Sequence, residues 1–130
     1  MPAVERWHLP SIEATGKREP RVLFSTPACR AVVIDLKAGE KMGEHQVRER
    51  AIVEVVSGQV ALGAAGAETE CVAGTLATFE PGERHTLRAL DDSRLLLLLA
   101  PWPGDGHYLV GEEAHPDRVP ANASVPPLAS

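Results

Sequence analysis

The sequence predicts an all-β protein folded as a sandwich or barrel. Short apolar runs recur at a spacing of about eight to twelve residues, with glycine, proline and aspartate turns between them. No stretch shows the long 3.6-residue periodicity of an amphipathic helix. Because the chain has 130 residues, of which 44% are apolar, we expect one packed domain. Aromatic residues make up only 4%, so aliphatic side chains must fill its core.

The expected strands follow one another between residues 21 and 100. Arg30–Leu36 is rich in β-branched residues, and the five leucines of Leu95–Leu99 predict a strand buried on both faces. Gly63–Gly66 predicts a hairpin turn, and Glu80–Glu83 predicts a turn that delivers His85 onto the following strand. The full set of expected strands is 21–25, 30–36, 47–56, 59–62, 68–72, 75–79, 86–90 and 94–100.

Both ends of the chain differ in character from this middle part. Residues 1–21 predict an arm with little regular structure, and prolines from Pro101 to Pro127 exclude a long regular element from the tail, residues 101–130. We expect apolar side chains to pin the arm to the β-domain or to a partner subunit, and others to anchor the start of the tail. These side chains are Trp7, Leu9 and Ile12 in the arm, and Trp102, Tyr108 and Leu109 in the tail.

Charge and cysteine content exclude several classes of function. A net charge of -5 argues against nucleic-acid binding, which relies on clustered lysine and arginine. The N-terminus lacks the apolar region of a secretory signal, and Leu95–Leu99 is too short to span a bilayer. Cys29 and Cys71 have no CxxC partner, which favours free thiols in a cytoplasmic protein.

Two histidines form the candidate site. His45 and His85 each lie at the mouth of an expected strand, beside turn residues. Histidine is the commonest protein metal ligand and the usual acid or base near neutral pH. Two histidines held by β-strands therefore predict a binding or catalytic site.

The segments around these histidines resemble the two motifs of the cupin superfamily. The first motif reads Gly, five residues, His, one residue, His, three or four residues, Glu, six residues, Gly. The second reads Gly, a strand, Pro-x-Gly, two residues, His, and often Asn three or four residues later. The resemblance covers roughly residues 22–100 and implies a jelly-roll, or double-stranded β-helix, barrel. The matching residues are Gly39, His45, Gly58, Gly74, Gly82 and His85.

The chain departs from this family's pattern at its metal ligands. Val47 stands in place of the second histidine, and Ala51 or Ile52 in place of the glutamate. The proline of the second motif comes one residue late, at Pro81, and no asparagine follows His85. Two of the family's four ligand positions therefore remain.

One hypothesis restores the ligand set with a different carboxylate. In an extended run from Val47 to Val56, Glu49 lies on the same face as His45, together with the less polar residues that would line the interior. The resemblance implies a divalent metal, Fe, Mn, Ni or Zn, and His45, His85 and Glu49 would form a two-histidine, one-carboxylate site. Such a site predicts a metal-dependent oxygenase or isomerase that acts on a small molecule. Alternatively, Glu49 faces solvent near the barrel mouth and pairs with an arginine.

Two further hypotheses need no metal. In one, Val47 and Ala51 make the pocket apolar and roomier, and His45 and His85 anchor a small-molecule ligand. In the other, both histidines are buried and satisfied, no cavity separates the sheets, and the protein is a dimeric structural module. The resemblance also implies a homodimer, since small cupins are commonly dimers.

Other residues near the candidate site have two interpretations each. Four arginines flank the histidines in sequence, and they would favour an anionic substrate at the barrel mouth or serve as ordinary charges on the outer face. His107 or His115 in the tail could supply a third ligand. The four arginines are Arg48, Arg50, Arg84 and Arg88.

Overall fold

The computed structural model of the chain describes residues 4–16, 20–45, 47–103 and 118–121, with only the backbone of residues 43–45. Within these residues no helix is long and apolar enough to cross a membrane. A short 3-10 turn precedes the strands. The elements are η1 (Leu9–Ser11), β1 (Arg21–Thr26), β2 (Cys29–Leu36), β3 (Lys41–His45), β4 (Arg50–Ser57), β5 (Gln59–Ala64), β6 (Ala67–Val72), β7 (Leu76–Phe79), β8 (His85–Ala89) and β9 (Ser93–Ala100).

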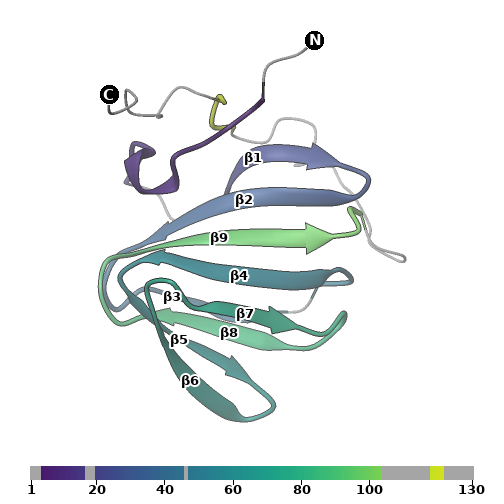
Figure 1. The fold of residues 1–130 in the computed structure, drawn as a ribbon. Helices are drawn as coiled ribbons and strands as arrows, with labels where there is room; N and C mark the ends of the chain where they lie inside the picture. The colour runs from purple at the N-terminus through teal and green to yellow at the C-terminus, as the bar shows by residue number, and fades with distance from the viewer. Residues whose placement is uncertain (1–3, 17–19, 46, 104–117, 122–130) are drawn as a thin grey trace.

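The strands form two antiparallel sheets that face each other (Figure 1). One sheet has the order β1-β2-β9-β4-β7 and the other β3-β8-β5-β6. The chain passes between the sheets several times, for example from β4 to β5 and from β8 to β9. The predicted all-β class and the predicted jelly-roll architecture are confirmed.

The expected strand from Val47 to Val56 is wrong at its start. The segment Lys41–His45 forms β3, which the sequence analysis did not predict, and β4 begins only at Arg50. Arg48 and Glu49 lie in a bend between the two strands. β3 has little apolar alternation of its own, and its place is set by pairing with β8, where His45 faces His85 across the ladder.

The hairpin between β5 and β6 turns later than expected. Gly63 and Ala64 belong to β5, and the turn residues are Ala65 and Gly66. Their φ angles are 54° and 80°, so both are left-handed, as the tight two-residue turn of a β-hairpin requires.

The main core fills the space between the two sheets. On β4 the alternate residues Ala51, Val53 and Val55 are buried, as the predicted alternation requires. They meet Leu95 of β9, and Val60 and other residues of the second sheet close the core.

A second core covers the outer face of the five-stranded sheet. The N-terminal arm, drawn in purple in Figure 1, lies on this face together with a short segment near residue 119. Ile12 is 4% exposed in this cluster, and the indole N–H of Trp7 donates to the Val119 carbonyl oxygen at 2.9 Å. Leu96 and Leu98 of β9 pack against it from below. The arm is therefore pinned to its own barrel, and β9 is covered on both faces.

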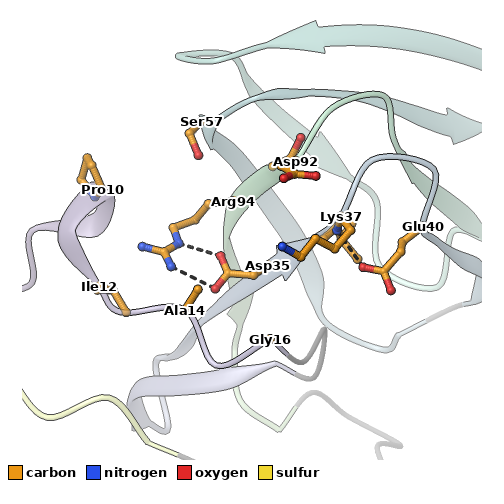
Figure 2. Close-up of a pocket in the computed structure, with 12 residues that line it drawn as sticks. Pro10, Ile12, Ala14, Gly16, Asp35, Lys37, Glu40, Ser57, Asp92 and Arg94 are labelled. Atoms are coloured by element: carbon orange, nitrogen blue, oxygen red, sulfur yellow. Dashed lines mark hydrogen bonds and ion pairs between the residues drawn. The ribbon is translucent and has the colours of Figure 1, made fainter.

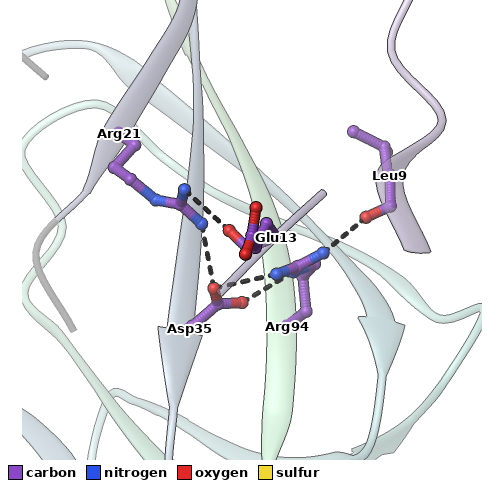
Figure 3. A network of polar contacts seen from close by, with 5 residues as sticks. All are labelled: Leu9, Glu13, Arg21, Asp35 and Arg94. Atoms are coloured by element: carbon purple, nitrogen blue, oxygen red, sulfur yellow. Dashed lines mark hydrogen bonds and ion pairs between the residues drawn. The ribbon is translucent and has the colours of Figure 1, made fainter. Parts of the chain in front are cut away.

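A buried charged network ties the arm to the sheet (Figure 3). Asp35 on β2 accepts hydrogen bonds from Arg94 at 2.6 and 2.9 Å and from Arg21 at 3.0 Å. Arg94 also donates to the Leu9 carbonyl oxygen at 2.8 Å, and Arg21 donates to that of Glu13 at 3.0 Å. The two guanidinium groups thus hold the backbone of the arm while Asp35 balances part of their charge.

The start of the tail packs as expected at one residue. Trp102 packs against the main core, and the guanidinium carbon of Arg30 lies 4.3 Å from the centre of its ring, a cation–π contact. The other expected anchors, Tyr108 and Leu109, and the tail histidines, His107 and His115, lie outside the described residues.

Candidate functional site

A cavity of about 170 Å³ lies between the two sheets. Leu95, Leu97 and Leu99 of β9 form one wall, and most other lining side chains are also aliphatic. The only polar side chains among the lining residues are His85 and Thr86 at the start of β8. The structural-module hypothesis required that no cavity separate the sheets, and this geometry contradicts it.

The turn before β8 positions His85. Gly82 donates its backbone N–H to the Val47 carbonyl oxygen at 2.8 Å, which ties the turn to the segment that leads into β4. Glu83 accepts from the backbone N–H of Glu80 at 3.1 Å through its side chain, and its own N–H donates to the Glu80 carbonyl oxygen at 3.0 Å. The turn predicted at Glu80–Glu83 therefore forms, and His85 opens the next strand as expected.

His85 is a buried, oriented imidazole. The side chain is 7% exposed, and its ring stacks on Phe79 with centres 4.3 Å apart and planes 15° from parallel. Its Nδ1 lies 3.2 Å from the Glu83 carbonyl oxygen. Because a carbonyl oxygen only accepts, the hydrogen bond places a proton on Nδ1, and in the neutral ring Nε2 then carries the lone pair. This is the arrangement that histidine ligands of metals commonly use.

His45 is the backbone partner of His85 in the β3–β8 pairing. Residues paired in this way have their Cβ atoms on the same face of the sheet and close together. The side chain of His45 lies outside the described part of the structure, so only its register is established. The predicted proximity of the two histidine positions therefore holds for the backbone.

Glu49 is buried, with an exposure of 0%. The alternative in which this carboxylate faces solvent is therefore wrong. Its burial comes from the bend between β3 and β4 rather than from an extended strand. Among the side chains that the structure describes, no three His, Cys, Asp or Glu residues are close enough to hold a metal ion.

The four flanking arginines separate into different roles. Arg50 pairs with Glu80 and Arg88 pairs with Glu68, each at 2.9 Å between exposed side chains. The hydrogen bond from Arg88 and its positive charge hold the pKa of Glu68 below its usual value. Arg48 is exposed, and Arg84 lines a surface groove of about 160 Å³ beside His85.

Sequence reasoning missed three contributors to this site. Phe79 supports His85, Thr86 forms part of the cavity wall, and Gly63 leaves room for the Thr86 hydroxyl, which a Cβ at Gly63 would overlap. Thr86 is adjacent to His85 in the sequence, but the contact between Gly63 and Thr86 depends on the β5–β8 register. A single sequence does not contain that register.

A larger cleft, of about 360 Å³, lies at the opposite end of the barrel under the arm (Figure 2). Four of its charged side chains have structural partners. Glu40 accepts from the backbone N–H of Lys37 at 2.7 Å, and Asp92 accepts from that of Ala38 at 2.9 Å. Asp35 and Arg94 in its wall belong to the network that holds the arm. These groups stabilise turns and the arm, and the histidine site lies elsewhere.

Solved structures with a similar fold were found by comparison. No protein-family model matches the chain, and no curated protein matches it. A protein of Klebsiella pneumoniae with a double-stranded β-helix domain superposes with a TM-score of 0.68 at 19% identity, covering 81% of this chain and 95% of that one. A cupin superfamily protein of Desulfitobacterium hafniense gives a TM-score of 0.67 at 14% identity, with coverages of 77% and 94%.

The protein has the cupin fold. A third solved structure, a G106A mutant of salicylate 1,2-dioxygenase from Pseudoaminobacter salicylatoxidans, shares 19% identity with this chain and superposes with a TM-score of 0.56. The match covers 59% of this chain and 22% of the dioxygenase. Cupin barrels thus occur both as small single units and within larger enzymes, and the fold alone does not assign an activity.

The glycines of the two motifs lie in turns of the barrel. The four have φ angles between 79° and 91°, a region that residues with a Cβ rarely adopt. The presence of these glycines is therefore explained by the turns of the fold. The two missing ligand positions affect metal binding and not the turns. These glycines are Gly39, Gly58, Gly74 and Gly82.

Proposed function

We propose that this cupin binds a small, largely apolar molecule in the cavity between its sheets, with His85 as the polar anchor. The observation that carries the proposal is the cavity of about 170 Å³, whose lining is apolar except at His85 and Thr86. Natural small-molecule sites commonly combine an apolar pocket with a few placed polar groups. Val47, which stands where the family pattern has its second histidine, lines this cavity, and so does Ala51, one of the two residues that can stand in place of the glutamate.

The energetics favour a compact apolar ligand. A ring that buries roughly 150 Å² of apolar surface gains about 4 kcal/mol at 25 cal/mol per Å², before the cost of association. An engineered apolar cavity of about 150 Å³ holds benzene, so this cavity has a suitable size. We therefore expect toluene to bind with a dissociation constant in the millimolar range or below.

Filling the cavity tests this proposal. Ala51 is 1% exposed and lines the cavity, so Ala51→Leu should occupy the space that the ligand needs. Toluene binding, measured by saturation-transfer NMR and by the ligand-induced rise in Tm, should be lost in Ala51→Leu. The matched control is Ala73→Leu, at an exposed turn residue, which should bind as the unchanged protein does. A wild-type protein that does not bind toluene, or an Ala51→Leu variant that binds it equally well, contradicts the proposal.

The second candidate function is that of a metal-dependent oxygenase or isomerase. Three observations favour it: the register of His45 opposite His85, the contact of His85 Nδ1 with the Glu83 carbonyl oxygen, and the complete burial of Glu49. A buried carboxylate is costly unless it is protonated, paired or bound to a metal. His45, His85 and Glu49 would hold a divalent Fe, Mn, Ni or Zn ion, which would supply open positions for a small substrate.

Metal analysis of untagged protein tests this candidate. We expect near-stoichiometric metal by elemental mass spectrometry, and at least a tenfold loss in His85→Ala, because removal of one ligand weakens a three-ligand site strongly. His8→Ala is the matched control, since His8 is an exposed histidine of the arm. Wild-type protein that stays metal-free after incubation with Fe(II), Mn(II), Ni(II) and Zn(II) would rule this candidate out and leave the first proposal standing.

We also propose that this cupin forms a homodimer. Besides the likeness to small cupins, the support is a pair of exposed apolar side chains at the β6–β7 turn, Val72 at 58% and Leu76 at 69%. Multi-angle light scattering should give twice the chain mass of 13.9 kDa, and Leu76→Lys should shift the equilibrium toward monomer. A monomeric mass at high concentration contradicts the proposal.

A further inference from the structure

The cleft under the arm has two unlike walls (Figure 2). On the arm side its lining is apolar, from Pro10, Ile12 and Ala14, and the facing wall of β2, β9 and their turns is charged. The volume of about 360 Å³ lies within the range of small-molecule sites. A ligand with an apolar part and charged groups therefore matches this cleft better than a wholly apolar one.

Arg94 is a buried cation in the charged wall. Its side chain is 8% exposed. Of the five N–H donors of its guanidinium group, two bond Asp35 and one bonds the Leu9 carbonyl oxygen. Within the described part of the chain the other two N–H donors have no protein acceptor. They can therefore bind an anionic group of a ligand.

Positive charge exceeds negative charge around Asp35. Its single carboxylate is shared by Arg94 and Arg21, so the network keeps one positive charge in excess. The Lys37 side chain extends into the cleft on the Asp35 side (Figure 2). Among the described residues no carboxylate forms an ion pair with the Lys37 ammonium group. This part of the cleft therefore favours a ligand carboxylate.

Two carboxylates beside this region favour a cation. Glu40 accepts the Lys37 backbone N–H through one oxygen, and Asp92 accepts that of Ala38 through one oxygen. Both side chains line the cleft. A carboxylate has two acceptor oxygens, so each retains one that can accept from an ammonium group of a ligand. The cleft thus offers acceptors for a cation next to donors for an anion.

We infer that this cleft binds a free amino acid with an apolar side chain. The α-carboxylate meets Arg94 and Lys37, the α-ammonium group meets the remaining oxygens of the two carboxylates, and the side chain packs against the arm. When Arg21 is included, the charged wall holds three cations and three carboxylates, so a zwitterion matches it better than an ion of either sign. This site is separate from the cavity between the sheets and goes beyond the proposed function.

Three probes with one carbon skeleton test the inference: L-leucine, 4-methylpentanoate, which lacks the ammonium group, and 3-methylbutylamine, which lacks the carboxylate. In isothermal titration we expect L-leucine to bind at least about threefold more tightly than either analogue, a modest ratio because Lys37 and Asp92 are exposed. In two-dimensional NMR, L-leucine should shift the amide signals of residues 36–40 and 91–94, and not those of residues 85–87 beside the inner cavity.

Two substitutions assign the ends of the ligand. Lys37→Gln should weaken the binding of L-leucine and 4-methylpentanoate and leave 3-methylbutylamine unchanged. Asp92→Asn, which keeps an oxygen that can accept from Ala38, should weaken L-leucine and 3-methylbutylamine and leave 4-methylpentanoate no weaker. Arg48→Gln is the control, since it removes the same charge as Lys37→Gln from an exposed side chain in the bend between β3 and β4. It should bind L-leucine as the unchanged protein does.

Several results would overturn the inference. They are a wild-type protein that does not bind L-leucine, an analogue that binds as tightly as L-leucine, and a Lys37→Gln variant that binds L-leucine no more weakly than Arg48→Gln does. Shifts confined to residues 85–87 would also overturn it, because the ligand would then lie in the inner cavity. None of these results changes the expectation for toluene, so the proposed function stands or fails separately.

Discussion

Asp35 is the residue on which the charged network of the outer face depends. It bonds two guanidinium groups whose side chains are only 8% and 10% exposed, Arg94 and Arg21. Burial removes water from these charged groups at a cost in free energy, and the attraction to the Asp35 carboxylate offsets this cost. Removing one partner from a buried network of this kind leaves the other charges buried and unpaired, which strongly destabilises the native state.

Replacing the Asp35 carboxylate tests how strongly the charged network depends on it. We expect Asp35→Ala to lower the free energy of unfolding by about 3–5 kcal/mol, because two buried arginines lose their counter-charge. Urea denaturation monitored by tryptophan fluorescence measures the change. Glu80→Ala, which breaks the exposed pair with Arg50, should cost about 1 kcal/mol or less. Equal losses in the two variants would show that burial does not govern the strength of these pairs.

At the scale of the element, β9 serves two cores at once. Leu95, Leu97 and Leu99 face the cavity, while Leu96 and Leu98 face the arm. The strand lies between β2 and β4 in the sheet, so it has no exposed edge. Its continuous run of leucines reflects this position, because each face needs apolar side chains for a different purpose.

Adjacent substitutions on β9 should therefore have different consequences. Leu97→Ala should enlarge the cavity and admit larger ring ligands, while hydrogen exchange in the arm stays unchanged. Leu98→Ala should speed hydrogen exchange at residues 7–12 and leave toluene binding unchanged. Each should cost about 1–3 kcal/mol of stability, below the value for fully buried leucines because both side chains are only half-buried. If both variants changed the arm and the cavity alike, the two faces of the strand would be coupled.

At the scale of the whole molecule, the end of the barrel opposite His85 joins the two sheets. The chain crosses from β4 to β5 at Gly58 and from β8 to β9 near Asp92. These crossovers pack closely: a Cβ on Gly58 would overlap the Asp92 carbonyl oxygen and lie 2.7 Å from the Cα of Ser93. Gly58 also has a φ of +83°, which disfavours any other residue.

Gly58→Ala should therefore destabilise the whole barrel. Backbone strain and overlap with a neighbouring crossover together predict a loss of about 2–4 kcal/mol in the free energy of unfolding. Chemical denaturation measures it, with Gly66→Ala as the control, since that glycine has a similar φ of 80° but open space around it. The Gly66→Ala control measures the cost of backbone strain alone. If Gly58→Ala lost no more free energy of unfolding than this control, the two crossovers would be able to move apart without a cost in free energy.

Much of the fold could be predicted because its signals are local. The glycines of the two motifs specify turns through their own backbone angles, and the alternation in Ala51–Val55 specifies which face of a strand is buried. Both act within a few residues. The β3 strand could not be predicted in this way, since its position comes from pairing with β8, about forty residues later in the chain.

The sequence by itself determined the all-β class, the turn framework and the place of His85 at the start of a strand, because each depends on residues adjacent in the chain. Tertiary structure alone decided that Glu49 is buried and that an apolar cavity remains between the sheets. It also decided that Arg84 lines a surface groove, whereas Arg88 pairs with Glu68. These features depend on which side chains from distant strands meet, and that is set by register and packing between the two sheets.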